Sequence, residues 1–219
     1  MARGCRALDL IPPAPGEAAE AAAAALAAAG LEGARAAVRL TLTAGSGRGL
    51  DRPADAETRL IATASPAPSP EGPIRLRTAS VRRNDQSPAS RLKTLSYLDN
   101  VLARRQARAQ GADEAIMLNT RGEIACAAAA NLFWIAEGRL CTPALACGVL
   151  DGIVRAQAIG AAAALGVGAA EVRAGPPALE AAEAAFVTNS LAGVRAVSEI
   201  DGRALQASAL VDAISSRCR

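Results

Sequence analysis

The sequence contains no histidine, and Lys93 is its single lysine among 24 basic side chains in 219 residues. Histidine is the side chain that usually titrates near neutral pH, so an enzyme of this composition must find its acid and base elsewhere. Aromatic residues are also scarce, at 2%, whereas 51% of the chain is hydrophobic. We therefore expect a core of small and branched aliphatic side chains, divided between two unequal parts.

A large excess of one charge is absent too, because the net charge is only +3. Acidic and basic residues are interspersed, without the basic stripe that a phosphate backbone requires, so we expect no nucleic-acid partner. The most apolar long segment, residues 16–33, is interrupted by glutamates and closed by glycines, which predicts a helix exposed to water rather than a membrane span. Without a recognisable signal peptide, the expected location is the cytoplasm, with no membrane partner.

The five cysteines are odd in number, and none forms a Cys-x-x-Cys pair. Without histidine, a zinc site is not expected, and no metal is predicted. This pattern is typical of reduced thiols in a cytoplasmic protein.

The predicted fold class is α+β with mixed sheets. The first part contains a helix over residues 16–30 and strands over 34–45 and 57–65, joined by a glycine-rich loop that lacks the lysine of a phosphate-binding loop. Prolines then crowd residues 65–72, which predicts a linker. We therefore expect a partial small α/β domain over 1–64, a linker over 65–72 and a large domain over 73–219.

The second part alternates predicted strands with two long helices. The first helix is expected over residues 94–111, and the second over the alanine-rich residues 152–167. Short strands precede and follow the second helix, and a final helix begins at Ser208. The apolar residues expected on one face of the first helix are Leu95, Leu98, Val101 and Leu102.

Lys93 lies at the junction of a loop and a helix, where a side chain can point into a site. The segment "GVLDGIVR" places a glycine turn directly before a helix, so the amides of Gly152, Ile153 and Val154 are free to bind a phosphate. Thr188, Asn189 and Ser190 form a second polar cluster at a strand end. One lysine with a phosphate site indicates a phosphorylated aldehyde held as a Schiff base, although a solvated lysine and ordinary helix caps would give the same pattern.

Five linked segments resemble the class IV, or fold type IV, pyridoxal-phosphate enzymes. They are "KTLSYLDNVLARRQA", "GADEAIMLNTRGEIA", "NLFWIAEGRLCTP", "LDGIVR" and "VTNSLAGVRAV". This family includes branched-chain aminotransferases, D-amino acid aminotransferases and aminodeoxychorismate lyase, and "NLFW" with "TNSLAGV" is most similar to the lyase branch. The resemblance implies a two-domain fold and the cofactor pyridoxal 5'-phosphate.

The same resemblance assigns roles to individual residues. It makes Lys93 the catalytic, Schiff-base lysine and places the Tyr97 hydroxyl near the ring oxygen of the cofactor. Ile153 and Val154 match the backbone amides that bind phosphate, with valine where the family often has threonine. Ser190, with the backbone around Asn189, matches the second phosphate contact.

Two features depart from the family pattern. Cys126 stands where a glutamate usually pairs with the pyridine nitrogen, and a thiol is a weaker partner for that atom. Glu123 is expected to be a poor substitute, because three residues along a strand reverse the face. The arginine that grips the phosphate in the family would precede Met1, which leaves Arg3 and Arg6 as nearby candidates and predicts a small domain that is truncated or starts upstream.

The resemblance leaves three functions open. The best match is 4-amino-4-deoxychorismate lyase, which releases pyruvate and p-aminobenzoate. A branched-chain or D-amino acid aminotransferase is the second reading, and a catalytically impaired protein that keeps the fold is the third. In each active case the substrate is a small amino compound, and the family implies a homodimer.

Overall fold

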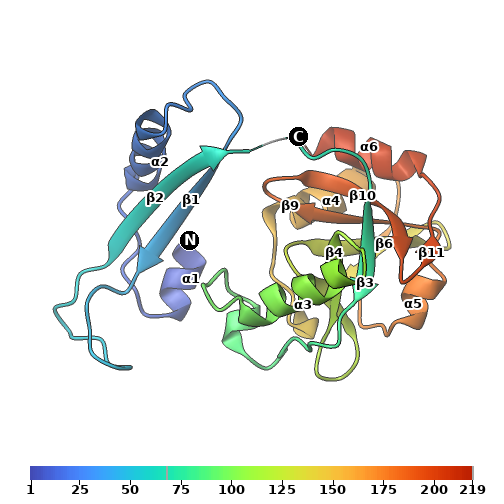
Figure 1. The fold of residues 1–219 in the computed structure, drawn as a ribbon, viewed down its shortest axis with the longest axis horizontal. Helices are drawn as coiled ribbons and strands as arrows, with labels where there is room; N and C mark the ends of the chain where they lie inside the picture. Colours follow the sequence, from blue (N-terminus) through green and yellow to red (C-terminus); the bar gives the residue numbers. More distant parts are fainter. Residues whose placement is uncertain (68, 219) are drawn as a thin grey trace. The chain divides into compact units, whose positions relative to one another are not determined.

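The computed structural model describes residues 1–67 and 69–218. The chain divides into two compact units, Met1–Ser69 and Pro70–Arg219 (Figure 1). The division falls inside the segment 65–72 that was expected to be a linker, although the second strand continues through Pro66.

The first unit is a β-hairpin with a helix packed on it (Figure 1). Strands β1 (Ala36–Thr43) and β2 (Arg59–Pro66) pair antiparallel along their whole length. The covering helix is α2 (Glu17–Ala28), where glutamates stand in the first turn and alanine fills the interior, as helix propensity and the helix dipole favour. A short helix, α1 (Ala2–Ala7), precedes it and carries both Arg3 and Arg6.

The second unit is built on a nine-stranded mixed sheet with the order β5-β4-β3-β10-β9-β6-β7-β8, and β11 pairs with β10. The sheet curls, which brings β5, at one end of the strand order, into contact with β6 and β7. Its strands are β3 (Ile74–Thr78), β4 (Glu114–Leu118), β5 (Ile124–Ala127), β6 (Asn131–Ala136), β7 (Arg139–Pro143), β8 (Ala169–Val172), β9 (Ala184–Asn189), β10 (Gly193–Ile200) and β11 (Arg203–Ala204). Its helices are α3 (Leu98–Ala109), α4 (Ile153–Ala164), α5 (Pro177–Glu180) and α6 (Ala209–Arg217), with 3₁₀ turns η1 (Pro88–Ser90) and η2 (Leu145–Cys147).

Strands β6 and β9 direct alternate side chains into two different cores. Phe133 and Phe186 belong to the core beneath α4 and α6, whereas Leu132 and Val187 belong to the core on the other face. Because side chains two residues apart share a face, Asn131 and Thr188 point to the same side as the two phenylalanines. Polar groups therefore stand at the end of the face that α4 covers.

Helix α3 corrects one expectation from the sequence. It begins at Leu98 rather than near residue 94, and the side chains it buries are Asn100, Ala103 and Ala107. These small residues pack on strands β4 and β5, where alanine side chains allow close approach. The apolar face expected from the sequence is instead exposed to solvent, with exposed fractions of 41–70%, in Leu95, Leu98, Val101 and Leu102.

No helix within residues 1–67 and 69–218 is both long and apolar enough to cross a bilayer. All five cysteines in the described chain are free thiols.

Candidate functional site

Lys93 lies in the loop between η1 and α3, five residues before the helix begins at Leu98. Its Nζ donates a hydrogen bond of 2.5 Å to the Tyr97 hydroxyl and lies 4.5 Å from the centroid of the same ring. Tyr97 is the N-cap residue of α3, so its backbone position is set by the start of the helix. The Tyr97 hydroxyl and ring then position the Lys93 amine. The single lysine of the chain is therefore exposed to solvent, and Tyr97 holds its amine in place.

Three asparagine side chains connect the turn between β5 and β6 to the segments that carry the other predicted site residues. Asn100, one helical turn after Tyr97, donates to the Ala128 carbonyl at 2.7 Å. Asn189, at the end of β9, donates to the Ala129 carbonyl at 3.2 Å. Asn131, the first residue of β6, donates to the Leu150 carbonyl before α4 at 2.8 Å. The start of α3, the end of β9 and the start of α4 therefore converge on one turn.

Cys126 lies in β5 immediately before this turn. Its side chain is only 6% exposed and packs with the small side chains beneath α3. Burial raises the pKa of the Cys126 thiol, and the nearby Arg83 guanidinium opposes this effect without reversing it. The group at this position is consequently a neutral thiol at neutral pH, unlike a carboxylate.

The start of α4 has the geometry of an anion site. Gly152 is its N-cap and makes no side-chain cap, and the following residue, Ile153, is 73% exposed. The first amides of a helix have no intrahelical partner and lie at its positive end. Val154 buries its side chain in the core beneath the helix, so it offers the amide alone. A Cβ built on Gly152 would meet Asn131 Oδ1 at 2.2 Å, so only glycine fits here.

Gly152→Ala is expected to displace Asn131 and distort the first turn of α4. The affinity for pyridoxal 5'-phosphate should fall by roughly tenfold or more, since a contact to a charged group is worth about 1.5–3 kcal/mol. Absorbance titration with the cofactor measures the change. Gly160→Ala, in the same helix with nothing near its added Cβ, is the matched control and should stabilise the helix by up to about 1 kcal/mol. Equal cofactor affinity in both variants would contradict the assignment.

The end of β9 supplies the second polar cluster. Asn189 Oδ1 accepts from the amides of Leu191 and Ala192, at 3.0 and 2.8 Å, so its side chain shapes the turn rather than facing a ligand. Thr188 is 1% exposed, and its hydroxyl has no hydrogen-bond partner within the described residues. Ser190 is exposed at the tip. The cluster therefore offers an unsatisfied buried hydroxyl and an exposed one.

The loop that carries Lys93 is anchored from below by Asp85 and Arg83. Asp85 is fully buried and accepts from the Thr120 hydroxyl at 2.6 Å and from Arg121. Arg83 Nη2 donates to the Ser90 carbonyl at 2.6 Å. Arg83 Nε also donates to the Gly148 carbonyl at 2.5 Å. The loop is thereby fixed to the β4–β5 turn and to the segment before α4.

Glu123 does not reach the position of Cys126. Its carboxylate accepts hydrogen bonds from Asn119 at 2.7 Å, from Arg173 at 2.9 Å and from Arg121. These donors, Asn119 first, lower the pKa of Glu123 to about 2. The Thr120 hydroxyl is likewise the main reason why the pKa of Asp85 lies below its usual range. Both carboxylates therefore stabilise the β4–β5 turn and the segments hydrogen-bonded to it.

These lowered pKa values predict acid sensitivity of the second unit. A carboxylate whose pKa is depressed in the folded state stabilises that state above its unfolded pKa, and this contribution is lost as pH falls. For Glu123 the window runs from pH 4.5 down to about 2. Urea unfolding followed by fluorescence of Trp134, the single and buried tryptophan, should show falling stability across this window. Glu123→Gln should flatten the decline; an unchanged slope would contradict the role of Glu123.

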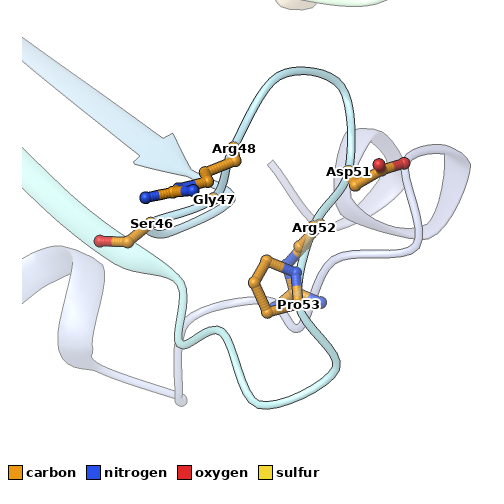
Figure 2. Close-up of a pocket in the computed structure, with 6 residues that line it drawn as sticks. All are labelled: Ser46, Gly47, Arg48, Asp51, Arg52 and Pro53. Atoms are coloured by element: carbon orange, nitrogen blue, oxygen red, sulfur yellow. The ribbon is translucent and has the colours of Figure 1, made fainter.

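The glycine-rich loop between β1 and β2 lines a shallow pocket of about 520 Å³ in the first unit. Figure 2 shows its six lining residues, with the Ser46 and Asp51 side chains directed apart rather than toward a common point. Arg52 Nε donates to the Ala44 carbonyl at 2.9 Å, so the loop is tied by its own contacts. Nothing in it gathers the groups of a phosphate site.

Sequence reasoning did not single out Arg83, Asn100 or Asn131. Asn100 and Asn131 are buried polar residues within a helical and an apolar stretch, whereas Arg83 is half-buried in a polar loop. A buried amide must find a partner, so an asparagine directly before "LFWI" was the available signal.

Comparison with known proteins identifies the fold and the family of the chain. A solved branched-chain aminotransferase from the archaeon Thermoproteus uzoniensis, with norvaline, superimposes with a TM-score of 0.87 at 28% identity, covering 98% of this chain and 73% of that chain. The fold is thus that of the fold type IV aminotransferases. The family model for amino-transferase class IV matches residues 1–200, and the chain belongs to this family.

Two curated relatives carry different activities in their names. A Methanocaldococcus jannaschii protein, named provisionally as a branched-chain-amino-acid aminotransferase, is 35% identical over 174 residues, which cover 77% of this chain and 60% of the relative. The aminodeoxychorismate lyase of Bacillus subtilis is 36% identical over 115 residues, covering 51% of this chain and 38% of the relative. The chain therefore spans about half the length of these relatives.

Proposed function

We propose that the protein is a pyridoxal 5'-phosphate enzyme and that it releases pyruvate and p-aminobenzoate from 4-amino-4-deoxychorismate. The observation that carries the proposal is the single lysine, held by Tyr97 at the start of α3 and tied through Asn100 to the turn that also gathers α4 and β9. One amine beside an anion site is what a phosphorylated aldehyde requires.

The residues present suit this cofactor. Lys93 would hold it covalently, the amides of Ile153 and Val154 would bind its phosphate together with Ser190, and Cys126 would face its ring nitrogen. When bound, the cofactor supplies an electron sink for the bond broken at the substrate α-carbon. The Lys93 amine would take the α-proton and later return a proton, which would supply acid–base chemistry in a chain without histidine.

Cys126 favours the lyase over an aminotransferase. A neutral thiol stabilises a protonated ring nitrogen far less than a carboxylate does. A reaction whose released electron pair leaves with an ether oxygen depends less on the ring than one that stores the pair on the cofactor. The branched-chain aminotransferase name of the Methanocaldococcus jannaschii relative supports the second candidate, with D-amino acid transfer as a variant of it.

Three substrates distinguish these functions in the protein saturated with pyridoxal 5'-phosphate. Release of p-aminobenzoate from 4-amino-4-deoxychorismate, followed by its fluorescence, is the expected result. Formation of a branched-chain keto acid, or of pyruvate from D-alanine, with 2-oxoglutarate as acceptor would replace the lyase by an aminotransferase. A visible cofactor band without any product would identify a catalytically impaired protein, and failure to bind the cofactor would overturn the proposal as a whole.

A further inference from the structure

A pocket of about 420 Å³ in the second unit is lined by four arginines, Arg75, Arg104, Arg108 and Arg195. They come from β3, from the last two turns of α3 and from β10. The pocket is separate from the candidate cofactor site, because Tyr97 and Arg108 stand at opposite ends of α3, about 16 Å apart at 1.5 Å per residue.

The acidic residues nearby do not neutralise this cluster. Asp113 Oδ2 lies 3.6 Å from Arg75 Nε and also accepts the Arg75 amide at 2.8 Å. Glu114 Oε2 lies 3.6 Å from Arg104 Nε, and burial raises the pKa of the Glu114 carboxyl, which weakens it as a counter-charge. Four guanidinium groups thus face two carboxyl groups, so the cluster keeps a net positive charge.

The guanidinium groups also retain unused donors. Arg104 Nε is shielded from solvent yet has no hydrogen-bond partner among the described residues. The Arg108 side chain makes no hydrogen bond or ion pair within residues 1–67 and 69–218. It lies one helical turn from Arg104, where like charges repel. Arg195 is fixed by the carbonyls of Glu71 and Gly72, at 2.6 and 3.1 Å, which orients its fork without neutralising it.

We propose that this arginine pocket binds a small polyanion carrying at least two negative charges, either a phosphate ester or a polycarboxylate. Guanidinium forks match both groups through paired charge-assisted hydrogen bonds. Such a ligand would accept hydrogen bonds from the exposed parts of the Arg104 and Arg108 guanidinium groups and offset the repulsion between them. The site is independent of the proposed reaction, and its ligand is distinct from the cofactor and the substrate.

Calorimetric titration with inorganic pyrophosphate and with citrate tests the pocket, in protein saturated with pyridoxal 5'-phosphate and at constant ionic strength. Saturable binding is expected for at least one of the two, with roughly a tenfold or greater loss in the Arg104→Gln/Arg108→Gln variant. Arg105→Gln, on the same helix but outside the pocket, is the matched control and should bind as the parent does.

Arg195→Gln, remote in sequence from α3, provides a second weakening variant if the double variant unfolds. Preference for pyrophosphate would indicate a phosphate ester, and preference for citrate a polycarboxylate. Absence of saturable binding to both probes would overturn the proposal. An equal loss of affinity in Arg105→Gln would also overturn it, because the effect would then come from general charge. Full affinity in the pocket variants would overturn it as well, because the pocket arginines would then not hold the anion.

Discussion

Lys93→Ala is expected to lose both the covalently held cofactor and turnover, with a fall in kcat on the order of 10²–10⁴-fold or more. The physical reason is that no other lysine exists in the chain to replace the amine. Borohydride reduction of the parent protein saturated with cofactor should fix the mass of the cofactor on the peptide that contains Lys93, and mass spectrometry measures it.

Lys93→Arg separates chemistry from charge in the same experiment. It keeps a cation near Tyr97, but a guanidinium does not condense with an aldehyde as an amine does. It should therefore fail as completely as Lys93→Ala, whereas Tyr97→Phe should retain covalent attachment. Turnover by Lys93→Arg within tenfold of the parent, or reduction that labels only the N-terminal amine, would refute the role of Lys93.

Phe133→Ala is expected to destabilise the second unit by about 3–5 kcal/mol, the usual cost of removing a buried aromatic ring. Phe133 and Phe186 are the only two phenylalanines, both fully buried, and their rings stack with centroids 4.7 Å apart. The rest of this core consists of alanine, cysteine and branched aliphatic side chains, none of which has the volume to fill the cavity. Urea unfolding followed by Trp134 fluorescence gives the free energy, and cofactor affinity should also fall, because Asn131 lies two residues away on the same face.

Leu98→Ala is the control, since Leu98 is 70% exposed and should change stability by no more than about 0.5 kcal/mol. A double-mutant cycle with Phe186→Ala should return a coupling of about 0.5–1.5 kcal/mol for the stacked pair. A loss below about 1 kcal/mol in Phe133→Ala would show that the core relaxes around the cavity, contrary to the expected result.

The sequence predicted most of the secondary structure because period and composition were clear. The alanine-rich helices, the β1–β2 hairpin and most of the strands from "EAIML" to "SEI" lie where alternation and breakers placed them. The face of α3 was predicted wrongly, since leucines usually mark the buried stripe, yet here the alanines pack because the sheet comes too close for larger side chains.

The candidate site was predictable only in part. Lys93 was conspicuous as the single lysine, and linked motifs indicated Ile153, Val154 and Ser190. The contacts that bring them together are hydrogen bonds from asparagine side chains to main-chain carbonyls. Every residue has such a carbonyl, so the sequence does not indicate which one accepts. The arginine pocket was hidden for a similar reason, because its members come from three elements that only the sheet order brings together.

The β5–β6 turn has a consequence for how substitutions would be tolerated. Asn100 and Asn189 donate to the main-chain carbonyls of Ala128 and Ala129 in this turn. The side chain of Ala129 is exposed and takes no part in the hydrogen bond from Asn189. Ala129 could drift among many residue types while the two asparagines could not. A variable residue at position 129 would then lie in the turn that holds α3 and β9 together, and a search for invariant positions would miss that turn.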